Sequence, residues 1–288
     1  GIMISMNIHD LVNGDDPVAS LPEIFYRLKE AIDDPDSSYK EMGEIIAYDP
    51  GLTARLLKIV NSAFFGFPNR IETIPHAISI VGMDQLNDLV LSTTVIGQFK
   101  HIPSDLMSMK AFWEHSIACG LAARIIASQR KDSNPERFFV AGLMHDIGRL
   151  VICLKAPERA REAILLSKSQ NQALHQAELE LMGFDHAQVG ALLLKIWGLP
   201  QAHAAAVEFH HNPTQSTRFP LEAAIVHAAD IIINTLKLGW NQENLTFSSM
   251  DAGAWEQIQI PEDSLFTNIL NIVIEEYEQT ARIFLQEA

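Results

Sequence analysis

Histidine and aspartate residues recur inside apolar segments of this 288-residue chain. The stretch AGLMHDIGRL (141–150) places an imidazole and a carboxylate, His145 and Asp146, side by side in a run that otherwise resembles a hydrophobic core. A buried carboxylate without a partner costs several kcal/mol, so these groups need either each other or a further ligand. Asp230, in the apolar segment AADIIIN, raises the same question.

Taken together, the candidate residues provide five imidazoles and two carboxylates. They are His115, His145, Asp146, His186, His210, His211 and Asp230. Neutral histidine and aspartate are ligands for divalent transition metals. In the adjacent pair His145 and Asp146, the imidazole could bind one ion while the carboxylate bridges to a second, and such a pair could activate water against a phosphoester. The residues predict a site for one or two divalent ions, with iron favoured and manganese or zinc also suitable.

A structural interpretation of the same residues stays open. His115 shares a helical stripe with Cys119 and could be a buried, hydrogen-bonded histidine. His210 and His211 precede Asn212-Pro213, and a cationic histidine is favourable near a helix C-terminus. The whole set could therefore be a hydrogen-bonded network of the core without any metal.

Helices must position these residues, because helical periodicity dominates the chain and no alternating strand pattern stands out. Asn134-Pro135 starts the helix that carries the stretch 141–150. Asp185 followed by Gln188 resembles a capping box for the helix that begins at His186. Other helices predicted for this half span 104–130, about 201–211, about 220–237 and about 261–285, with a long loop at 239–261. A further helix starts at Pro157, and Gly183 is a predicted C-cap after ALHQAELELM (173–182).

The first half of the chain predicts shorter helices separated by turns. They span 21–34, 39–49, 52–66, 74–81 and 83–99. We therefore predict an all-α fold of two packed helical parts. The predicted division is an N-terminal extension at 1–16, a helical bundle at 17–103 and a longer helical domain at 104–288.

Composition narrows the class of protein. The formal net charge is −15 and no basic run is present, so direct nucleic-acid binding and attraction to anionic membranes are not expected. The chain has neither a signal-peptide pattern at its start nor about 18 consecutive apolar residues, which argues against a membrane protein. The two cysteines, Cys119 and Cys153, are typical of small buried residues in a reducing compartment. We expect a cytoplasmic protein.

The sequence resembles a known protein family. The order of His115, His145-Asp146 and Asp230 resembles the HD superfamily of metal-dependent phosphohydrolases. His186-x-x-x-Gly190 and His210-His211 resemble its HD-GYP branch, which hydrolyses cyclic di-GMP. The closer resemblance is to the HDOD family, HD-related output domains of bacterial signalling proteins. It rests on YDPGLTARLLKIVNSAFFGFP, FWEHSIACGLAARIIA, AGLMHDIGRLV, GFDHAQVGALLLKIWGLP and EFHHNP, and covers roughly residues 17–240.

The resemblance implies an all-helical protein with an HD-like domain over 104–288. Many HDOD members have lost metal ligands and act as signalling modules, whereas this chain keeps the matching positions. It departs from HD-GYP in having Arg149 where a lysine usually follows His-Asp-Ile-Gly, and in lacking a Gly-Tyr-Pro loop after His210-His211. The resemblance predicts a stand-alone regulatory protein that acts mainly by binding protein partners of a bacterial signalling pathway.

The alternative is a metal-dependent phosphohydrolase acting on a nucleotide or cyclic dinucleotide. In that case His145, Asp146 and Arg149 would be its catalytic residues, and a phosphoester would be its ligand. Phosphoryl transfer also requires positioned donors for the developing charge. The rigid, planar guanidinium of Arg149 contacts phosphoryl oxygens with a different geometry from the flexible ammonium of a lysine. We therefore expect turnover to be absent or slow.

Overall fold

The computed structural model describes residues 6–13, 15–99, 102–132, 134–236 and 250–285. Within these ranges every regular element is helical, which confirms the all-α prediction. The chain divides into two compact units: unit 1 consists of residues 1–20 and 99–271, and unit 2 of residues 21–98 and 272–288. Across the described ranges, no helix is both long and apolar enough to cross a membrane.

Unit 2 confirms the short helices predicted for the first half. It contains α2 (Glu23–Asp33), α3 (Tyr39–Ala47), α4 (Pro50–Val60), α5 (Ile74–Val81), α6 (Met83–Val95), η2 (Ile96–Gln98) and the part of α17 (Leu270–Leu285) from residue 272 onward. Side chains cap three of these helices: Ser38, Asp49 and Thr73 each accept a backbone N–H from the third helical residue. In α17, the Phe284 ring packs edge-on against Phe64, with ring centroids 6.4 Å apart.

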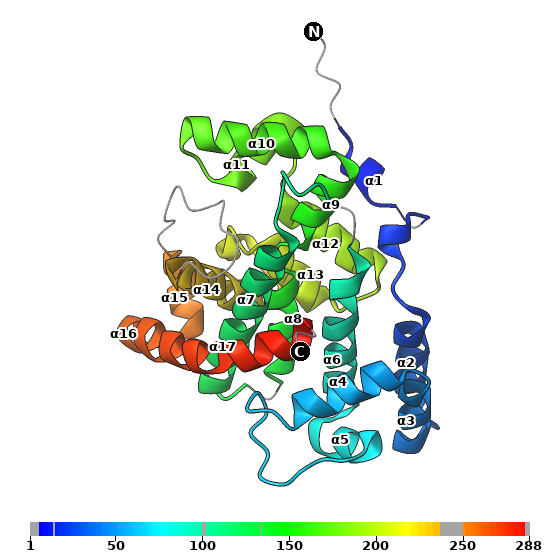
Figure 1. Cartoon of the computed structure of the whole chain (residues 1–288). Helices are drawn as coiled ribbons and strands as arrows, with labels where there is room; N and C mark the ends of the chain where they lie inside the picture. Colours follow the sequence, from blue (N-terminus) through cyan, green and yellow to red (C-terminus); the bar gives the residue numbers. More distant parts are fainter. Residues whose placement is uncertain (1–5, 14, 100–101, 133, 237–249, 286–288) are drawn as a thin grey trace. The chain divides into compact units, whose positions relative to one another are not determined.

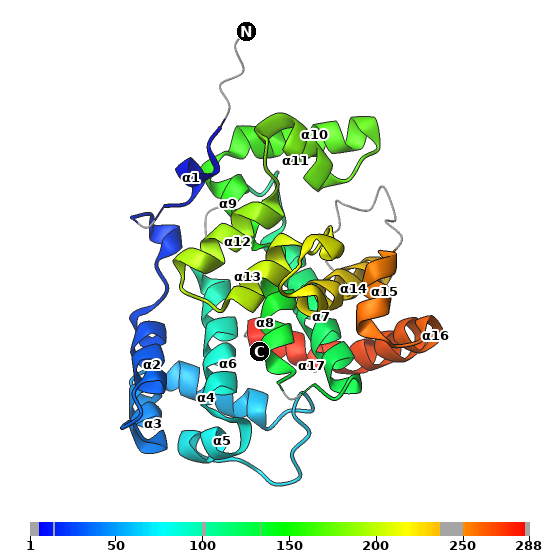
Figure 2. The ribbon, with the colours of Figure 1, turned by 180° about the vertical axis from the view of Figure 1, so that it is seen from behind.

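Unit 1 holds the remaining helices. They are α1 (Ile8–Leu11), η1 (Pro17–Ala19), α7 (Met109–Gln129), α8 (Glu136–Met144), α9 (Ile147–Lys155), α10 (Pro157–Gln170), α11 (Leu174–Met182), α12 (His186–Ile196), α13 (Gln201–Glu208), η3 (Pro213–Gln215), α14 (Pro220–Leu236), α15 (Ala252–Ile258), α16 (Glu262–Ser264), the π-helical turn η4 (Leu265–Ile269) and the start of α17. At its centre α7 packs against α8 and α14 (Figure 1). Seen from behind, α12 lies between α9 and α13 and contacts both (Figure 2).

Glycines let the helices that carry the candidate site approach closely. A Cβ added at Gly142 of α8 would lie 2.8 Å from the carbonyl oxygen of Cys119 in α7, which is too close for any larger residue. A Cβ at Gly148 of α9 would collide with the carbonyl of His186, the first residue of α12. These two contacts bring α7, α8, α9 and α12 together around the His145-Asp146 step.

Several local predictions are wrong. The helix predicted at 52–66 ends at Val60. The long helix begins at Met109 instead of 104, because the Ser108 side chain caps it there. The predicted helix through 141–150 is two helices, since α8 ends at Met144 and α9 begins at Ile147. The helix predicted to run to 211 ends at Glu208. The predicted loop at 239–261 contains α15, while its residues 239–249 lie outside the described ranges.

The compact units do not follow the chain in simple order, unlike the predicted division into 1–16, 17–103 and 104–288. The start of the chain belongs to unit 1, where Asp16 pairs with Lys155 of α9 and the Trp197 indole N–H donates to the Val18 carbonyl over 3.2 Å. Residues from 272 onward belong to unit 2, as the contact of Phe284 with Phe64 illustrates.

Candidate metal centre

The seven predicted site residues all lie in unit 1, and its helices bring them together. His115 is in the middle of α7, His145 and Asp146 form the break between α8 and α9, His186 opens α12, His210 and His211 follow the end of α13, and Asp230 is in α14. Six of them are buried, with at most 6% of any residue exposed, and only His211 is partly exposed. Residues far apart in sequence thus form one buried polar cluster.

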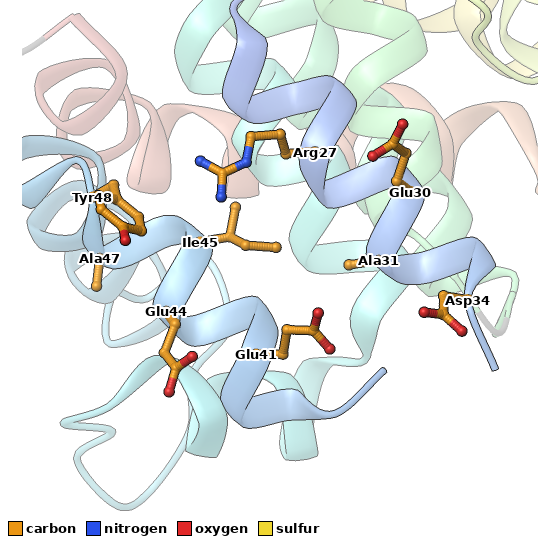
Figure 3. Close-up of a pocket in the computed structure, with 9 residues that line it drawn as sticks. All are labelled: Arg27, Glu30, Ala31, Asp34, Glu41, Glu44, Ile45, Ala47 and Tyr48. Atoms are coloured by element: carbon orange, nitrogen blue, oxygen red, sulfur yellow. The ribbon is translucent and has the colours of Figure 1, made fainter. Parts of the chain in front are cut away.

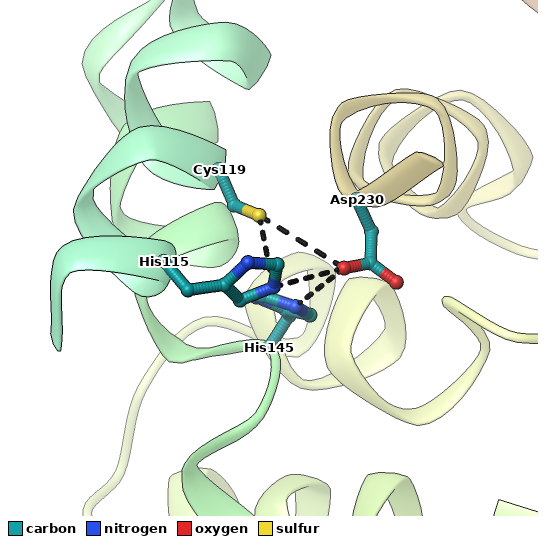
Figure 4. Close-up of side chains that lie close together, drawn as sticks. All are labelled: His115, Cys119, His145 and Asp230. Carbon is teal, nitrogen blue, oxygen red and sulfur yellow. Dashed lines mark hydrogen bonds and ion pairs between the residues drawn. The ribbon is translucent and has the colours of Figure 1, made fainter. Parts of the chain in front are cut away.

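One set of donor atoms surrounds Asp230. Its Oδ1 lies 3.2 Å from His115 Nε2 and 3.2 Å from His145 Nε2, as Figure 4 shows. Asp146 Oδ2 approaches the same set, 3.2 Å from His145 Nε2 and 3.9 Å from His115 Nε2. Ligands about 2.1 Å from a tetrahedral ion are about 3.4 Å from one another, so this spacing suits one divalent ion.

A second set of donor atoms meets the other oxygen of Asp146. Asp146 Oδ1 lies 3.2 Å from His186 Nε2 and 3.6 Å from His210 Nε2. His211 Nε2 lies 3.0 Å from His186 Nε2. The carboxylate of Asp146 therefore stands between two donor sets and presents a different oxygen to each.

Hydrogen bonds fix the orientation of three imidazoles. Nδ1–H of His145 donates to the Gly142 carbonyl, and Nδ1–H of His210 donates to the Val207 carbonyl, each over 2.6 Å. Nδ1–H of His186 donates to the Glu178 carboxylate over 2.5 Å. Because a carbonyl or carboxylate can only accept, each ring keeps its proton on Nδ1 and turns the lone pair of Nε2 toward the cluster, as metal-binding histidines do.

The charged groups of the cluster shift one another's pKa values. Burial lowers the pKa of His145, but the charges of Asp146 and Asp230 outweigh it and raise that pKa well above its usual value. Burial raises the pKa of both carboxyls, yet the neighbouring imidazoles hold the pKa values of Asp146 and Asp230 below their usual range. Both carboxylates are therefore anionic at neutral pH, and the cluster needs cations, supplied by protons or by metal ions.

Two buried atoms favour the interpretation that the cluster binds metal ions over the alternative of a hydrogen-bonded network without metal. Among the described residues, neither Asp146 Oδ1 nor His210 Nε2 makes a hydrogen bond. These two atoms face each other and His186 Nε2 in the second donor set, and buried polar atoms that lack a hydrogen bond are costly. Imidazole nitrogens with carboxylate oxygens are suitable ligands for iron, manganese or zinc, so the residues present fit a metal site.

Several neighbours of the cluster were not predicted from the sequence. Glu178 of α11 accepts both the backbone N–H and the ring N–H of His186. The His175 ring stacks on His211 with centroids 4.0 Å apart. His227 donates its Nδ1–H to the His210 carbonyl over 2.7 Å. His227 precedes Asp230 by three residues on one helix, which is a usable signal, whereas the other two contacts depend on how separate helices cross.

Arg149, the third predicted catalytic residue, is buried in the first turn of α9, where its backbone N–H donates to the Asp146 carbonyl over 2.9 Å. Burial raises the pKa of the Cys153 thiol to about 11, and the Arg149 charge opposes that rise. The guanidinium therefore acts electrostatically on the thiol one turn further along its own helix. A role for Arg149 toward a substrate stays a prediction.

Unit 2 offers a different kind of surface. Helices α2 and α3 border a cavity of about 700 Å³ (Figure 3). Glu30, Asp34, Glu41 and Glu44 line it together with one cation, Arg27, whose guanidinium lies 5.5 Å from the centre of the Tyr48 ring. This groove is acidic, and its lining contains no histidine or cysteine. The groups of clustered metal ligands found among the described residues all lie in unit 1.

Comparisons with known proteins agree with this architecture. A protein of Treponema pallidum described as uncharacterized is 28% identical over 198 residues, which make up 68% of this chain and only 38% of that protein. A crystal structure from Shewanella amazonensis, provisionally named a phosphohydrolase, is 24% identical with a TM-score of 0.74, covering 99% of this chain and 100% of the other. An HDOD domain protein of unknown function from Geobacter sulfurreducens is 23% identical with a TM-score of 0.72, covering 96% and 95%.

The structural similarities, at these low identities, establish the fold alone. The sequence of the chain supplies the family, because the HDOD domain model matches residues 18–213, about two thirds of its length. The chain therefore belongs to the HDOD family.

Proposed function

We propose that this HDOD protein binds two divalent transition-metal ions in unit 1 and acts mainly by binding other proteins. The observation that carries the metal proposal is the position of Asp146, whose Oδ2 lies 3.2 Å from His145 Nε2 and whose Oδ1 lies 3.2 Å from His186 Nε2. A bridging carboxylate between two imidazole-rich sets is the arrangement that a pair of ions requires. Iron is the favoured ion, and manganese or zinc also suit these donors.

The protein's own residues would hold and orient these ions. His115, His145 and Asp230 would bind the first ion, and His186, His210 and His211 the second, with Asp146 shared between them. The Gly142 and Val207 carbonyls and Glu178 hold three of the rings in the tautomer that exposes Nε2. Bound ions would neutralise the carboxylates and act as Lewis acids toward a phosphoester oxygen.

Burial favours a regulatory role over rapid catalysis. Six of the seven ligands are at most 6% exposed, so a phosphoester would have to approach past His211, the one partly exposed member. Arg149, the residue expected to stabilise phosphoryl charge, is itself buried in α9. We infer a structural or sensory metal pair that sets the conformation of unit 1, with proteins of a bacterial signalling pathway as the partners.

Elemental analysis after reconstitution with iron, manganese or zinc tests the metal proposal. We expect close to two ions per chain in the wild-type protein and a large loss in Asp146→Ala. The Asp105→Ala variant is a matched control, because Asp105 is exposed and pairs with Arg161 in the same unit. Less than about 0.1 ion per chain in every metal, together with an unchanged melting temperature, would contradict the proposal.

The alternative function is a metal-dependent phosphohydrolase acting on a nucleotide or cyclic dinucleotide. The observation that favours it is the complete donor set, since all seven predicted ligands converge. Steady-state hydrolysis of bis(p-nitrophenyl) phosphate and cyclic di-GMP, with each metal in turn, separates the two functions. Saturable turnover that disappears in both His145→Ala and Asp146→Ala would make hydrolysis the primary function, while bound metal without turnover supports regulation.

A further inference from the structure

A thiol lies directly beside the first donor set. Cys119 follows His115 by one turn of α7, and its residue is 0% exposed. Its Sγ lies 3.5 Å from His115 Nε2 and 3.9 Å from Asp230 Oδ1, and Figure 4 draws it pointing at both. The donor atoms of His115, Cys119, His145 and Asp230 all lie within 4.8 Å of one another.

The spacing of these four atoms resembles the edges of a coordination tetrahedron. With metal–nitrogen distances of about 2.1 Å and a metal–sulfur distance of about 2.3 Å, a tetrahedral ion separates nitrogen from sulfur by about 3.6 Å and nitrogen from oxygen by about 3.4 Å. The corresponding distances here are 3.5 Å for His115 to Cys119 and 3.2 Å for each histidine to Asp230. The sulfur lies 3.9 Å from Asp230 Oδ1, slightly more than the separation of about 3.6 Å expected for sulfur and oxygen on one such ion.

We propose that the Cys119 sulfur is a direct ligand of the first ion, together with His115, His145 and Asp230. The proposal rests on the proposed function, because it names a ligand of one of its two ions. On binding, the thiol gives its proton to solvent and the resulting thiolate carries a negative charge to the ion. The first site then has two nitrogens, one oxygen each from Asp230 and the shared Asp146, and one sulfur, whereas the second set contains no sulfur.

The other cysteine provides an internal comparison. Cys153 is also buried, but it belongs to none of the groups of clustered ligands found among the described residues. Burial raises the pKa of its thiol to about 11, as expected for a cysteine that serves only as a small core residue. Cys119 instead faces an imidazole and a carboxylate, so similar burial places the two thiols in different chemical surroundings.

A thiolate ligand changes which ions the first site prefers. Soft sulfur ligands favour zinc and iron, while manganese prefers oxygen donors. Replacing Cys119 with serine should therefore weaken zinc binding at this site by about tenfold or more, with manganese binding little changed. Cys153→Ser should leave the affinity for both metals unchanged.

Cobalt(II) absorption spectroscopy tests the proposal directly, because a cobalt–thiolate bond gives an intense near-ultraviolet charge-transfer band. Wild-type protein and Cys153→Ser, titrated with cobalt under reducing conditions, should develop this band with saturation at one sulfur-ligated ion per chain. In Cys119→Ser the band should be lost. A band that persists in Cys119→Ser would overturn the proposal, and so would its absence from cobalt-loaded wild-type protein.

Cobalt content measured on the same samples distinguishes failure of this inference from failure of the metal site. Cobalt bound to wild-type protein without the band refutes thiolate ligation and leaves the metal site standing. No cobalt bound at all refutes both. The spectrum of Cys153→Ser, in which Cys119 is the single cysteine, decides the question if Cys119→Ser does not fold, which far-ultraviolet circular dichroism would report.

Discussion

The cores of unit 1 and unit 2 differ in the polar groups that they bury. Among the described residues of unit 2, the buried polar side chains are the hydroxyls of Ser62, Ser92, Thr93 and Thr280. Each donates to a backbone carbonyl three or four residues earlier in its own segment, over 2.6–2.9 Å. Apart from its two cysteines, the described part of unit 1 buries thirteen acidic or basic residues, histidines included. They are Asp16, His115, Glu136, His145, Asp146, Arg149, Glu178, Asp185, His186, His203, His210, His227 and Asp230.

This difference means that the two cores depend on their surroundings in different ways. A core of apolar side chains with locally satisfied hydroxyls gains its stability from burial, which neither protons nor metal ions alter directly. A core with charged groups is stable only while those groups compensate one another. We therefore expect the stability of unit 1, and not that of unit 2, to depend on metal ions and on pH.

The largest effect should follow from Asp146→Ala. The substitution removes the bridging ligand and also leaves His145 and His186 without a carboxylate that raises their pKa values. We expect loss of both ions and, in metal-free protein, destabilisation on the order of 3–5 kcal/mol in urea unfolding. If the variant keeps its full metal content, the carboxylate does not bridge.

Hydrogen–deuterium exchange on the same variant locates the effect. Amides of α7, α9, α12 and α14 should exchange faster, while those of α2 to α6 should keep their wild-type rates. Equal acceleration in both units would remove the contrast between the two cores.

A smaller effect should follow from Glu178→Ala. This carboxylate accepts the ring N–H of His186 without belonging to either donor set, so it positions a ligand. Loss of such an orienting group typically lowers metal affinity by about 10–100-fold. Calorimetric titration should give that drop, a smaller one for Glu178→Gln, which keeps an acceptor, and no change for Glu180→Ala on the exposed face of α11. Equal affinities in all variants would contradict a positioning role.

His203 should make unit 1 sensitive to acid independently of any metal. Neither of its ring nitrogens has a hydrogen-bond partner among the described residues. Burial, with the charge of Arg137 adding to it, lowers the pKa of His203 from its usual value to about 4. Below pH 6.5 the unfolded chain therefore binds the proton more readily, and stability falls as pH falls toward 4.

The loss between pH 7 and pH 5 from this one histidine is about 2 kcal/mol. In His203→Leu, which cannot titrate, the drop in unfolding free energy between these pH values should be smaller by that amount. Urea unfolding of wild-type and variant protein at both pH values measures it. Identical drops in the two proteins would show that His203 does not titrate as described.

The smallest effect is expected in unit 2. The buried Thr93 hydroxyl donates to the Val90 carbonyl of its own helix over 2.9 Å. Replacing it with the similarly shaped valine in Thr93→Val should change stability by no more than about 1 kcal/mol. Metal content and pH dependence should match the wild-type protein. If Thr93→Val changed the metal content, binding of the proposed ions would depend on residues outside unit 1.

Local signals account for what could be predicted from the sequence. Caps such as Ser38 and Thr73, and the capping box of Asp185 with Gln188, act over three residues, so helices that begin there were predictable. The break at His145-Asp146 was missed because apolar periodicity continues through it. The helix after Asp251 was missed because GWNQENLTFSSMDAGAWEQIQIP looked like a loop; Asp251 caps it through Gly253 and Ala254.

In the candidate site, too, some residues could be predicted from local sequence signals and others could not. The seven ligands could be selected because each is a titratable residue on a predicted helix, four of them among apolar neighbours and His186, His210 and His211 at helix ends. Their partners could not: Glu178 reaches His186 only through the packing of α11 with α12, and Cys119 resembles any small core residue until α14 brings Asp230 beside it. Such contacts depend on helix crossings, to which Gly142 and Gly148 contribute by permitting close approach.

The central claim is that Asp146 stands between two divalent ions. Anomalous diffraction from crystals of protein reconstituted with iron, manganese or zinc tests it most directly, because it locates the ions without reference to activity. The account predicts two anomalous peaks about 3.5–4 Å apart, one beside each carboxylate oxygen of Asp146. No peak in the cluster from fully loaded crystals, or peaks only at sites away from Asp146, would contradict it.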